Sequence, residues 1–199
     1  MATLQSTRAS SIGLVFPGQG SQSVGMGRAL VETYPSIRSL YEEASSILRY
    51  DIGALCFEGP VERLNLTEYT QPALLVSSIA ALQAFKPLGI APIAVAGHSL
   101  GEYSALVAAG GMTYREAVAI VQKRGRYMAE AVPSGTGLVA ALLGLSVDVV
   151  KEVCREASSV GVVAAANFNS PGQIVIAGEK AAVERAIELA KAKGCKKAI

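Results

Sequence analysis

The sequence has 199 residues, of which 51% are hydrophobic, 17% are charged and 20 are glycine. This composition is typical of a globular chain of one domain, or one domain with a small appendage, and it excludes a disordered protein. The net charge of +2 indicates neither nucleic acid nor a membrane as partner, the single histidine excludes a histidine-based metal site, and no apolar run is long enough to span a bilayer.

The first half of the chain predicts strands that alternate with helices. Residues 12–16 (IGLVF) read as a buried strand that Pro17-Gly18 ends, and a glycine-rich loop follows. We expect helices over 28–39 and 41–48, followed by an irregular stretch over 51–69 that Gly59-Pro60 breaks. A helix that is apolar on all sides should begin at Gln71-Pro72 and end before Pro87. A strand over 93–96, a helix directly after it and a helix over 114–131 complete this half. This alternation favours a parallel α/β core.

The second half predicts a compact subdomain. A turn cluster over 133–137 is the candidate boundary between 12–132 and 133–199, and residues 1–11 are a polar tail without the apolar core of a secretory signal. We expect strands over 138–143, 162–166 and 173–177, helices over 147–158 and 179–193, a turn at NFNSPG and an extended segment over 195–199. The order β-α-β-β-α-β is that of a ferredoxin-like subdomain.

Gly97-His98-Ser99-Leu100-Gly101 has the G-x-S-x-G pattern of a nucleophile elbow. An apolar strand precedes it and a helix follows, which is the context that the motif requires. At a helix N-terminus, N–H groups and the helix dipole favour developing negative charge. We therefore interpret Ser99 as a nucleophile. The alternative is a serine that only caps the helix in a tight turn.

His98 is the only histidine of the sequence and stands beside Ser99. Neighbouring residues at such a turn point apart, and an elbow serine takes its base from a remote loop. We therefore interpret His98 as a structural or supporting residue. A direct role in proton transfer is the alternative.

Arg124 shares an apolar stripe of the helix predicted over 114–131, together with Ala117, Ile120, Val121 and Met128. A guanidinium on a buried face needs a planar anion, because an unpaired buried charge is strongly destabilising. That anion is either an internal Glu or Asp, or a carboxylate of the substrate, which the arginine fork binds at two points.

The glycine-rich loop over 16–22 is not a phosphate-binding loop. Ser23 stands where a dinucleotide fingerprint needs its third glycine, and Met26 stands where a P-loop needs lysine. Glycine also permits close backbone approach, and an N–H after a first strand can form half of an oxyanion hole. A plain turn is the alternative.

The three cysteines, Cys56, Cys154 and Cys195, lie far apart and form no CxxC pair. We expect reduced and mostly buried thiols in a cytoplasmic protein.

Six motifs together resemble the malonyl-CoA:acyl carrier protein transacylase family and stand in its order. They are FPGQGSQ at 16–22, TQPALL at 70–75, GHSLGEYSAL at 97–106, KRGRYM at 123–128, EAVPSGTG at 130–137 and NFNSPGQIVIAG at 167–178. The resemblance covers the chain from about residue 12 to its end.

The resemblance implies an α/β-hydrolase-like parallel-sheet core, incomplete in this chain, with an inserted ferredoxin-like subdomain. It implies ping-pong transfer of malonyl from coenzyme A to the phosphopantetheine thiol of acyl carrier protein in fatty acid biosynthesis, with Ser99 acylated. The implied partners are a coenzyme A thioester and acyl carrier protein. We expect no metal, no bound cofactor, and neither nucleic acid nor a membrane as a partner.

The resemblance also implies roles for other residues. The N–H groups of Leu100 and Gln19 would hold the oxyanion, Arg124 would pair with the malonyl carboxylate, and Asn167 and Asn169 would line the cleft. Leu100 is similar to the residue of malonyl-selective members, whereas methylmalonyl-selective polyketide acyltransferases tend to have glutamine there.

The sequence departs from the family because it ends at Ile199, before the segment that carries the family's catalytic histidine. General-base catalysis contributes about a hundred- to ten-thousandfold. We therefore expect a slow or inactive isolated chain with an exposed sheet edge or core face. Alternative functions are a polyketide synthase acyltransferase domain, a serine thioesterase or esterase, and a non-catalytic truncated form that docks carrier protein.

Overall fold

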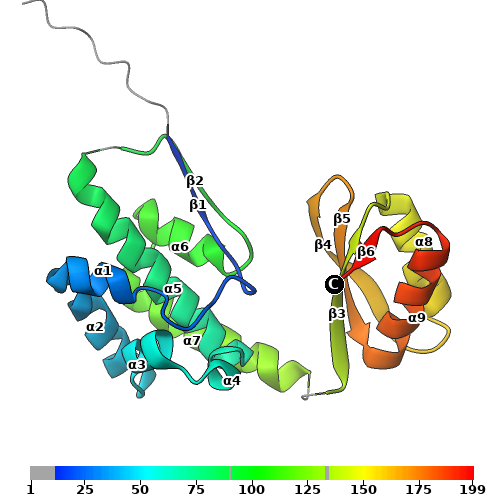
Figure 1. The fold of residues 1–199 in the computed structure, drawn as a ribbon, viewed down its shortest axis with the longest axis horizontal. Coiled ribbons are helices and arrows are strands. Elements are labelled where there is room, and N and C mark those ends of the chain that lie inside the picture. Colours follow the sequence, from blue (N-terminus) through cyan, green and yellow to red (C-terminus); the bar gives the residue numbers. More distant parts are fainter. Residues whose placement is uncertain (1–11, 90, 133–134) are drawn as a thin grey trace, which may run out of the picture. The chain divides into compact units, whose positions relative to one another are not determined.

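The computed structural model describes residues 12–89, 91–132 and 135–199 (Figure 1). The chain divides into two compact units, of which the first ends at Ala129 and the second begins at Glu130. The tail over 1–11 and the residues Pro133 and Ser134 of the predicted turn cluster lie outside the described residues. The subdomain limits 12–132 and 133–199 stay a prediction.

The first unit contains a parallel pair of strands. Strand β1 (Gly13–Phe16) pairs with β2 (Ala94–Gly97), and Gly13 lies opposite Ala94. Both strand predictions are confirmed to within one residue. The helices of this unit are α1 (Arg28–Thr33), α2 (Arg38–Leu48), α3 (Ile52–Glu58), α4 (Val61–Leu64), α5 (Thr67–Phe85), α6 (Gly101–Ala108) and α7 (Tyr114–Ala131), with 3-10 turns at Pro35–Ile37 and Lys86–Leu88.

Two predictions about the early helices are wrong. The helix expected over 28–39 ends at Thr33, because Tyr34 precedes a proline and leaves the helical region, with φ −127° and ψ 84°. The stretch expected to be irregular over 51–69 contains α3 and α4. The Asp51 carboxylate caps α3 by accepting a 2.8 Å hydrogen bond from the Ala54 N–H, and the short helices bury apolar side chains.

Helix α5 begins earlier than predicted. It starts at Thr67, so Pro72 lies inside the helix and not at its first position. The Thr70 hydroxyl donates to the backbone carbonyls of Leu64 and Leu66 and so secures the first turn. Since the helix buries a continuous run of side chains over 70–76, packing outweighs the backbone hydrogen bond that proline removes.

The core of the first unit lies between α2, α3, α5 and α7, and its fully buried side chains include Ile52, Leu75 and Val121. Burial in this core raises the pKa of the Cys56 thiol to about 12, so the thiol stays protonated. The strand pair is different, because Val15 of β1 is 79% exposed and Ile93, which directly precedes β2, is 74% exposed. The expected exposed apolar face is therefore present in the described residues.

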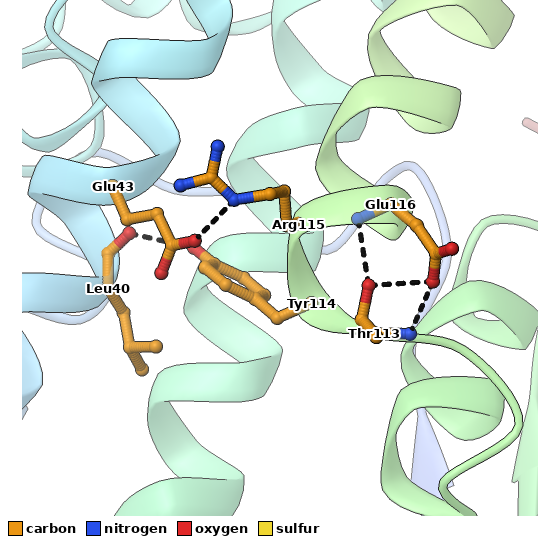
Figure 2. A network of polar contacts seen from close by, with 6 residues as sticks. All are labelled: Leu40, Glu43, Thr113, Tyr114, Arg115 and Glu116. Carbon is orange, nitrogen blue, oxygen red and sulfur yellow. Dashed lines mark hydrogen bonds and ion pairs between the residues drawn. The ribbon is translucent and has the colours of Figure 1, made fainter.

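The start of α7 is held by a network of polar contacts, which Figure 2 shows. The Thr113 N–H donates to Glu116 Oε2 (2.9 Å), and the Glu116 N–H donates to Thr113 Oγ1 (3.2 Å), which is a capping box. The Tyr114 hydroxyl donates to the Leu40 carbonyl (2.8 Å), and Arg115 Nε lies 3.2 Å from Glu43 Oε1. The capping box and the Tyr114 hydrogen bond hold the start of the helix that carries Arg124, whereas the exposed Arg115–Glu43 pair adds little.

The capping box makes a prediction about pH. Hydrogen bonds from the Thr113 hydroxyl and N–H lower the pKa of the Glu116 carboxyl. Because the folded-state pKa lies below the unfolded value, the stabilisation is present above the unfolded pKa and is lost as the pH falls through the folded pKa. We expect Glu116→Gln to be less stable than the wild type at pH 7, and the difference to vanish in acid. Urea unfolding at several pH values measures this, and a constant difference would contradict it.

The second unit folds around its own antiparallel sheet (Figure 1). Its elements are β3 (Gly137–Leu143), α8 (Val147–Ala157), β4 (Val163–Ser170), β5 (Gln173–Glu179), α9 (Lys180–Ala192) and β6 (Lys197–Ala198). The strand order is β4-β5-β3-β6, and the buried core includes Leu142, Val150 and Ile176. The predicted ferredoxin-like order is confirmed, as is the α/β class of the whole chain.

Strand β4 is longer than predicted. It runs through Ser170, so the stretch NFNS is part of the strand and only Pro171-Gly172 makes the turn. Gly172 adopts a φ of 82°, which favours glycine. The register of β4 against β5 shifts between Ala165 and Asn167. Such irregularities bend a strand and re-aim its side chains.

Candidate active site

Ser99 lies at the turn between β2 and α6, with a φ of 54°. A positive φ is unfavourable for a residue with a side chain, and the neighbouring glycines make this turn possible. A Cβ on Gly97 would lie 2.0 Å from the Gly101 carbonyl carbon, and one on Gly101 would lie 2.2 Å from the Phe16 oxygen. The structure thus has the backbone form of a nucleophile elbow.

Gly101→Ala tests the close packing of this turn. The added Cβ would meet the backbone of β1, which cannot move aside as a side chain could. We expect a loss of about 3 kcal/mol in the free energy of unfolding, measured with urea. Gly13→Ala is the matched control, because its nearest neighbour would be the Ala94 oxygen at 3.8 Å. Equal effects of the two substitutions would contradict the elbow packing.

The Ser99 hydroxyl points to Arg124. Ser99 Oγ accepts a 3.1 Å hydrogen bond from Arg124 Nη2. Leu100, and not Ser99, occupies the N-cap position of α6, and no side chain caps that helix. The alternative of a capping serine is therefore not supported by the geometry. Ser99 is exposed, so its hydroxyl is accessible to a substrate.

Arg124 is half-buried, and its partners are uncharged. Nη1 donates to Gln71 Oε1, Nη2 donates to Ser99 Oγ, and Cζ lies 5.8 Å from the centre of the Tyr103 ring. Within the described part of the chain, neither hydrogen-bond acceptor is a carboxylate, so the alternative of an internal Glu or Asp partner is not supported. The guanidinium keeps its full positive charge beside the serine.

The predicted apolar stripe of α7, which includes Arg124, is partly wrong. Ile120 is 40% exposed and Met128 is 45% exposed, and the buried face of α7 instead consists of Ala117, Val118, Val121 and Gly125. Arg124 thus lies at the side of the buried face, where it reaches both the protein interior and the exposed serine.

The first turns of α5 hold the parts of the site together. Gln19 Nε2 donates to Thr67 Oγ1 (3.1 Å), which ties the glycine-rich loop to this helix. A Cβ on Gly125 would lie 3.0 Å from Glu68 Cα, so glycine permits the close approach of α7. Sequence reasoning missed this role of Thr67 and Gln71. A glutamine in an otherwise apolar helix was the available signal, because a buried amide needs partners.

The glycine-rich loop packs on the elbow. A Cβ on Gly18 would lie 2.6 Å from the His98 carbonyl oxygen and 2.8 Å from His98 Nδ1. The loop therefore approaches the serine turn through glycine, and the His98 imidazole lies against Gly18. Among the described residues, no hydrogen bond joins the N–H of Gln19 or of Leu100 to another protein group.

The structure brings Gln19, Ser99, Leu100 and Arg124 together in the first unit. Asn167 and Asn169 belong to β4 of the second unit. In the described ranges, no helix is long and apolar enough to cross a membrane, and no group of three or more His, Cys, Asp or Glu side chains is placed to hold a metal ion.

A parallel strand pair that leads through a positive-φ serine into a helix defines an α/β protein of the nucleophile-elbow class. The chain matches the family described as acyl transferase domain over residues 14–199 and belongs to that family.

Two similar proteins are malonyl CoA-acyl carrier protein transacylases. The chain is 51% identical over 191 residues to the malonyl CoA-acyl carrier protein transacylase of Bacillus subtilis (strain 168), covering 96% of this chain and 60% of the relative. It is 52% identical over 186 residues to the protein of that name from Escherichia coli (strain K12), covering 93% and 60%.

Solved structures agree. An acyl carrier protein S-malonyltransferase from Vibrio cholerae has a TM-score of 0.87 at 50% identity, covering 94% of this chain and 61% of that one. A malonyl-transacylase in complex with a type II PKS acyl-carrier protein has a TM-score of 0.91 at 48% identity, covering 96% and 62%. This chain spans about 60% of the length of the Bacillus subtilis and Escherichia coli relatives.

Proposed function

We propose that this protein transfers a malonyl group from coenzyme A to the phosphopantetheine thiol of acyl carrier protein, in fatty acid biosynthesis. The observation that carries the proposal is the charged Arg124 within hydrogen-bond distance of Ser99 Oγ, with hydrogen-bond partners that are all uncharged among the described residues. In a malonyl group, one methylene separates the carboxylate from the reacting carbonyl. An arginine so close to the nucleophile suits that spacing. The two relatives named malonyl CoA-acyl carrier protein transacylase support the proposal.

The reaction proceeds in two steps through Ser99. In the first, Ser99 Oγ attacks the thioester carbonyl, the C–S bond breaks, and the coenzyme A thiol leaves with a proton. In the second, the phosphopantetheine thiol attacks the seryl ester, the C–O bond breaks, and Ser99 regains its proton. The N–H groups of Leu100 and Gln19 stabilise the oxyanion in both steps.

The other residues have supporting roles in the proposal. The malonyl carboxylate takes over Arg124 Nη2 from Ser99, which frees the hydroxyl for attack. For Asn167 and Asn169 of β4, the proposal keeps the substrate-binding role that the family resemblance implies. The His98 ring lies against Gly18, and the family resemblance implies that the general base is a histidine other than His98. The reaction takes place in the cytoplasm and needs no bound cofactor beyond the phosphopantetheine of the partner.

The test is an assay of the full-length protein with labelled malonyl-CoA and phosphopantetheine-loaded acyl carrier protein. We expect malonyl-carrier protein as product and a malonyl ester on Ser99, identified by mass spectrometry of peptides. Formation of free malonate without malonyl-carrier protein would favour a thioesterase and overturn the proposal. Methylmalonyl-CoA in a parallel reaction tests the acyl selectivity that Leu100 suggests.

A further inference from the structure

We infer that Gln71 determines acyl selectivity by positioning Arg124: it is an uncharged acceptor that aims the guanidinium without neutralising it. The inference rests on the proposed function, since it concerns how that site recognises a carboxylate. Gln71 is a positioning residue, because it acts through Arg124.

Gln71 is buried, and both ends of its amide have a partner. It is 1% exposed on α5, in a run of otherwise largely apolar buried side chains. Oε1 accepts a hydrogen bond from Arg124 Nη1, and Nε2 lies 3.1 Å from Met128 Sδ. A thioether sulfur is a weak acceptor, so the bond to Arg124 is the stronger of the two.

The orientation of the amide follows from these partners. Arginine offers only donors, so an amide turned by 180° would set its NH2 group against the guanidinium and leave its oxygen against the sulfur. Only the observed orientation satisfies both ends. Gln71 therefore holds one arm of the guanidinium at Nη1 and leaves Nη2 directed at Ser99.

Contacts of the neighbouring residues hold the backbone around Gln71 in place. One turn earlier in α5, Thr67 Oγ1 accepts from Gln19 Nε2, and Glu68 lies against Gly125, the residue that follows Arg124. The glycine lets α5 and α7 approach closely, which brings the Gln71 amide within reach of the arginine. A small change of side chain at position 71 should therefore alter the position of the Arg124 guanidinium more than the course of the backbone.

The lack of charge on Gln71 is the feature that matters for selectivity. A glutamate of the same shape could accept the same hydrogen bond, but it would form an ion pair with Arg124. Two opposite charges in contact at a partly buried site attract each other strongly, so the guanidinium would lose much of its affinity for a second carboxylate. A neutral amide orients the cation and leaves its charge for the substrate.

The experiment compares Gln71→Glu and Gln71→Met with the wild type in the full-length protein. For each, kcat and KM are measured with malonyl-CoA and with acetyl-CoA, which has no second carboxylate. We expect Gln71→Glu to raise KM for malonyl-CoA about tenfold or more while changing kcat/KM for acetyl-CoA by less than about threefold. Gln71→Met, which lacks the acceptor, should also weaken the preference for malonyl, because the guanidinium is no longer held.

Gln83→Glu is the matched control. It makes the same change of charge on an exposed residue of the same helix and should alter neither substrate's kinetics. Thermal unfolding of each variant separates a loss of fold from a loss of selectivity. The double variant Gln71→Met/Arg124→Ala adds a test of mechanism, since a residue that acts through Arg124 should have no further effect once Arg124 is removed.

Two results would overturn the role of Gln71 alone: a folded Gln71→Glu protein with unchanged KM for malonyl-CoA, or an equal loss with malonyl-CoA and acetyl-CoA. In both, the wild type still makes malonyl-carrier protein, so the proposed function stands. A wild type that forms no malonyl-carrier protein would overturn the proposed function and, with it, the inference.

Discussion

Ser99→Ala should abolish malonyl transfer, with a fall in kcat of about ten-thousandfold or more. Alanine removes the oxygen that forms the acyl-enzyme, and within the described residues only Arg124 hydrogen-bonds to that oxygen, so the fold should not depend on it. The measurement is the rate of malonyl-carrier protein formation, together with mass spectrometry of the protein after exposure to malonyl-CoA. No malonyl adduct should appear.

Ser104→Ala is the control for this change. Ser104 lies in α6 just after the elbow, and its buried hydroxyl has no hydrogen-bond partner among the described residues. Its removal should leave transfer intact, because no role in the site depends on that hydroxyl. A malonyl adduct on the Ser99→Ala protein, or full turnover by it, would show that another residue is the nucleophile.

Arg124→Ala should change which acyl groups the protein accepts. Without the guanidinium, the malonyl carboxylate loses a charge-assisted bond of about 1.5–3 kcal/mol, so kcat/KM for malonyl-CoA should fall about ten- to hundredfold. Acetyl-CoA has no second carboxylate, and its use should be maintained or improved. Competition between the two substrates for the same carrier protein measures the ratio directly.

Arg115→Ala is the matched control for charge, since Arg115 is an exposed arginine of the same helix whose ion pair, in the part of the chain that the structure describes, is with Glu43. Exposed ion pairs contribute about 0–1 kcal/mol, so this variant should keep both its stability and its selectivity. Equal losses of malonyl and acetyl transfer in Arg124→Ala would mean that Arg124 supports the fold of the site and does not recognise the carboxylate.

The sequence predicted those elements whose signal is local. Helix α7 has a capping box at its start and an apolar face along its length, and its predicted bounds agree with the structure. The elbow combines a short apolar strand, two glycines and a following helix, all within a few residues of one another. The second unit was also predicted in its order of elements, because its strands and helices have clear periodicity.

Other features depend on contacts that no local pattern contains. Helix α3 has seven residues, too few to establish a periodicity, and owes its stability to burial of Ile52 and Leu55. The start of α5 was placed at Gln71 because proline favours a first helical position, although packing carries the helix back to Thr67. Gln71 itself was missed, because its partner Arg124 is distant in sequence and only the crossing of α5 and α7 joins them.

The positive φ of Ser99 limits which nucleophiles an engineer could place at the elbow. A side chain branched at Cβ is strongly disfavoured in that region, so threonine would strain the turn even though it offers the same hydroxyl. Cysteine has an unbranched Cβ and differs from serine in one atom. The backbone of this turn therefore leaves room for a thiol that would trap the acyl group as a thioester, and it disfavours a secondary alcohol.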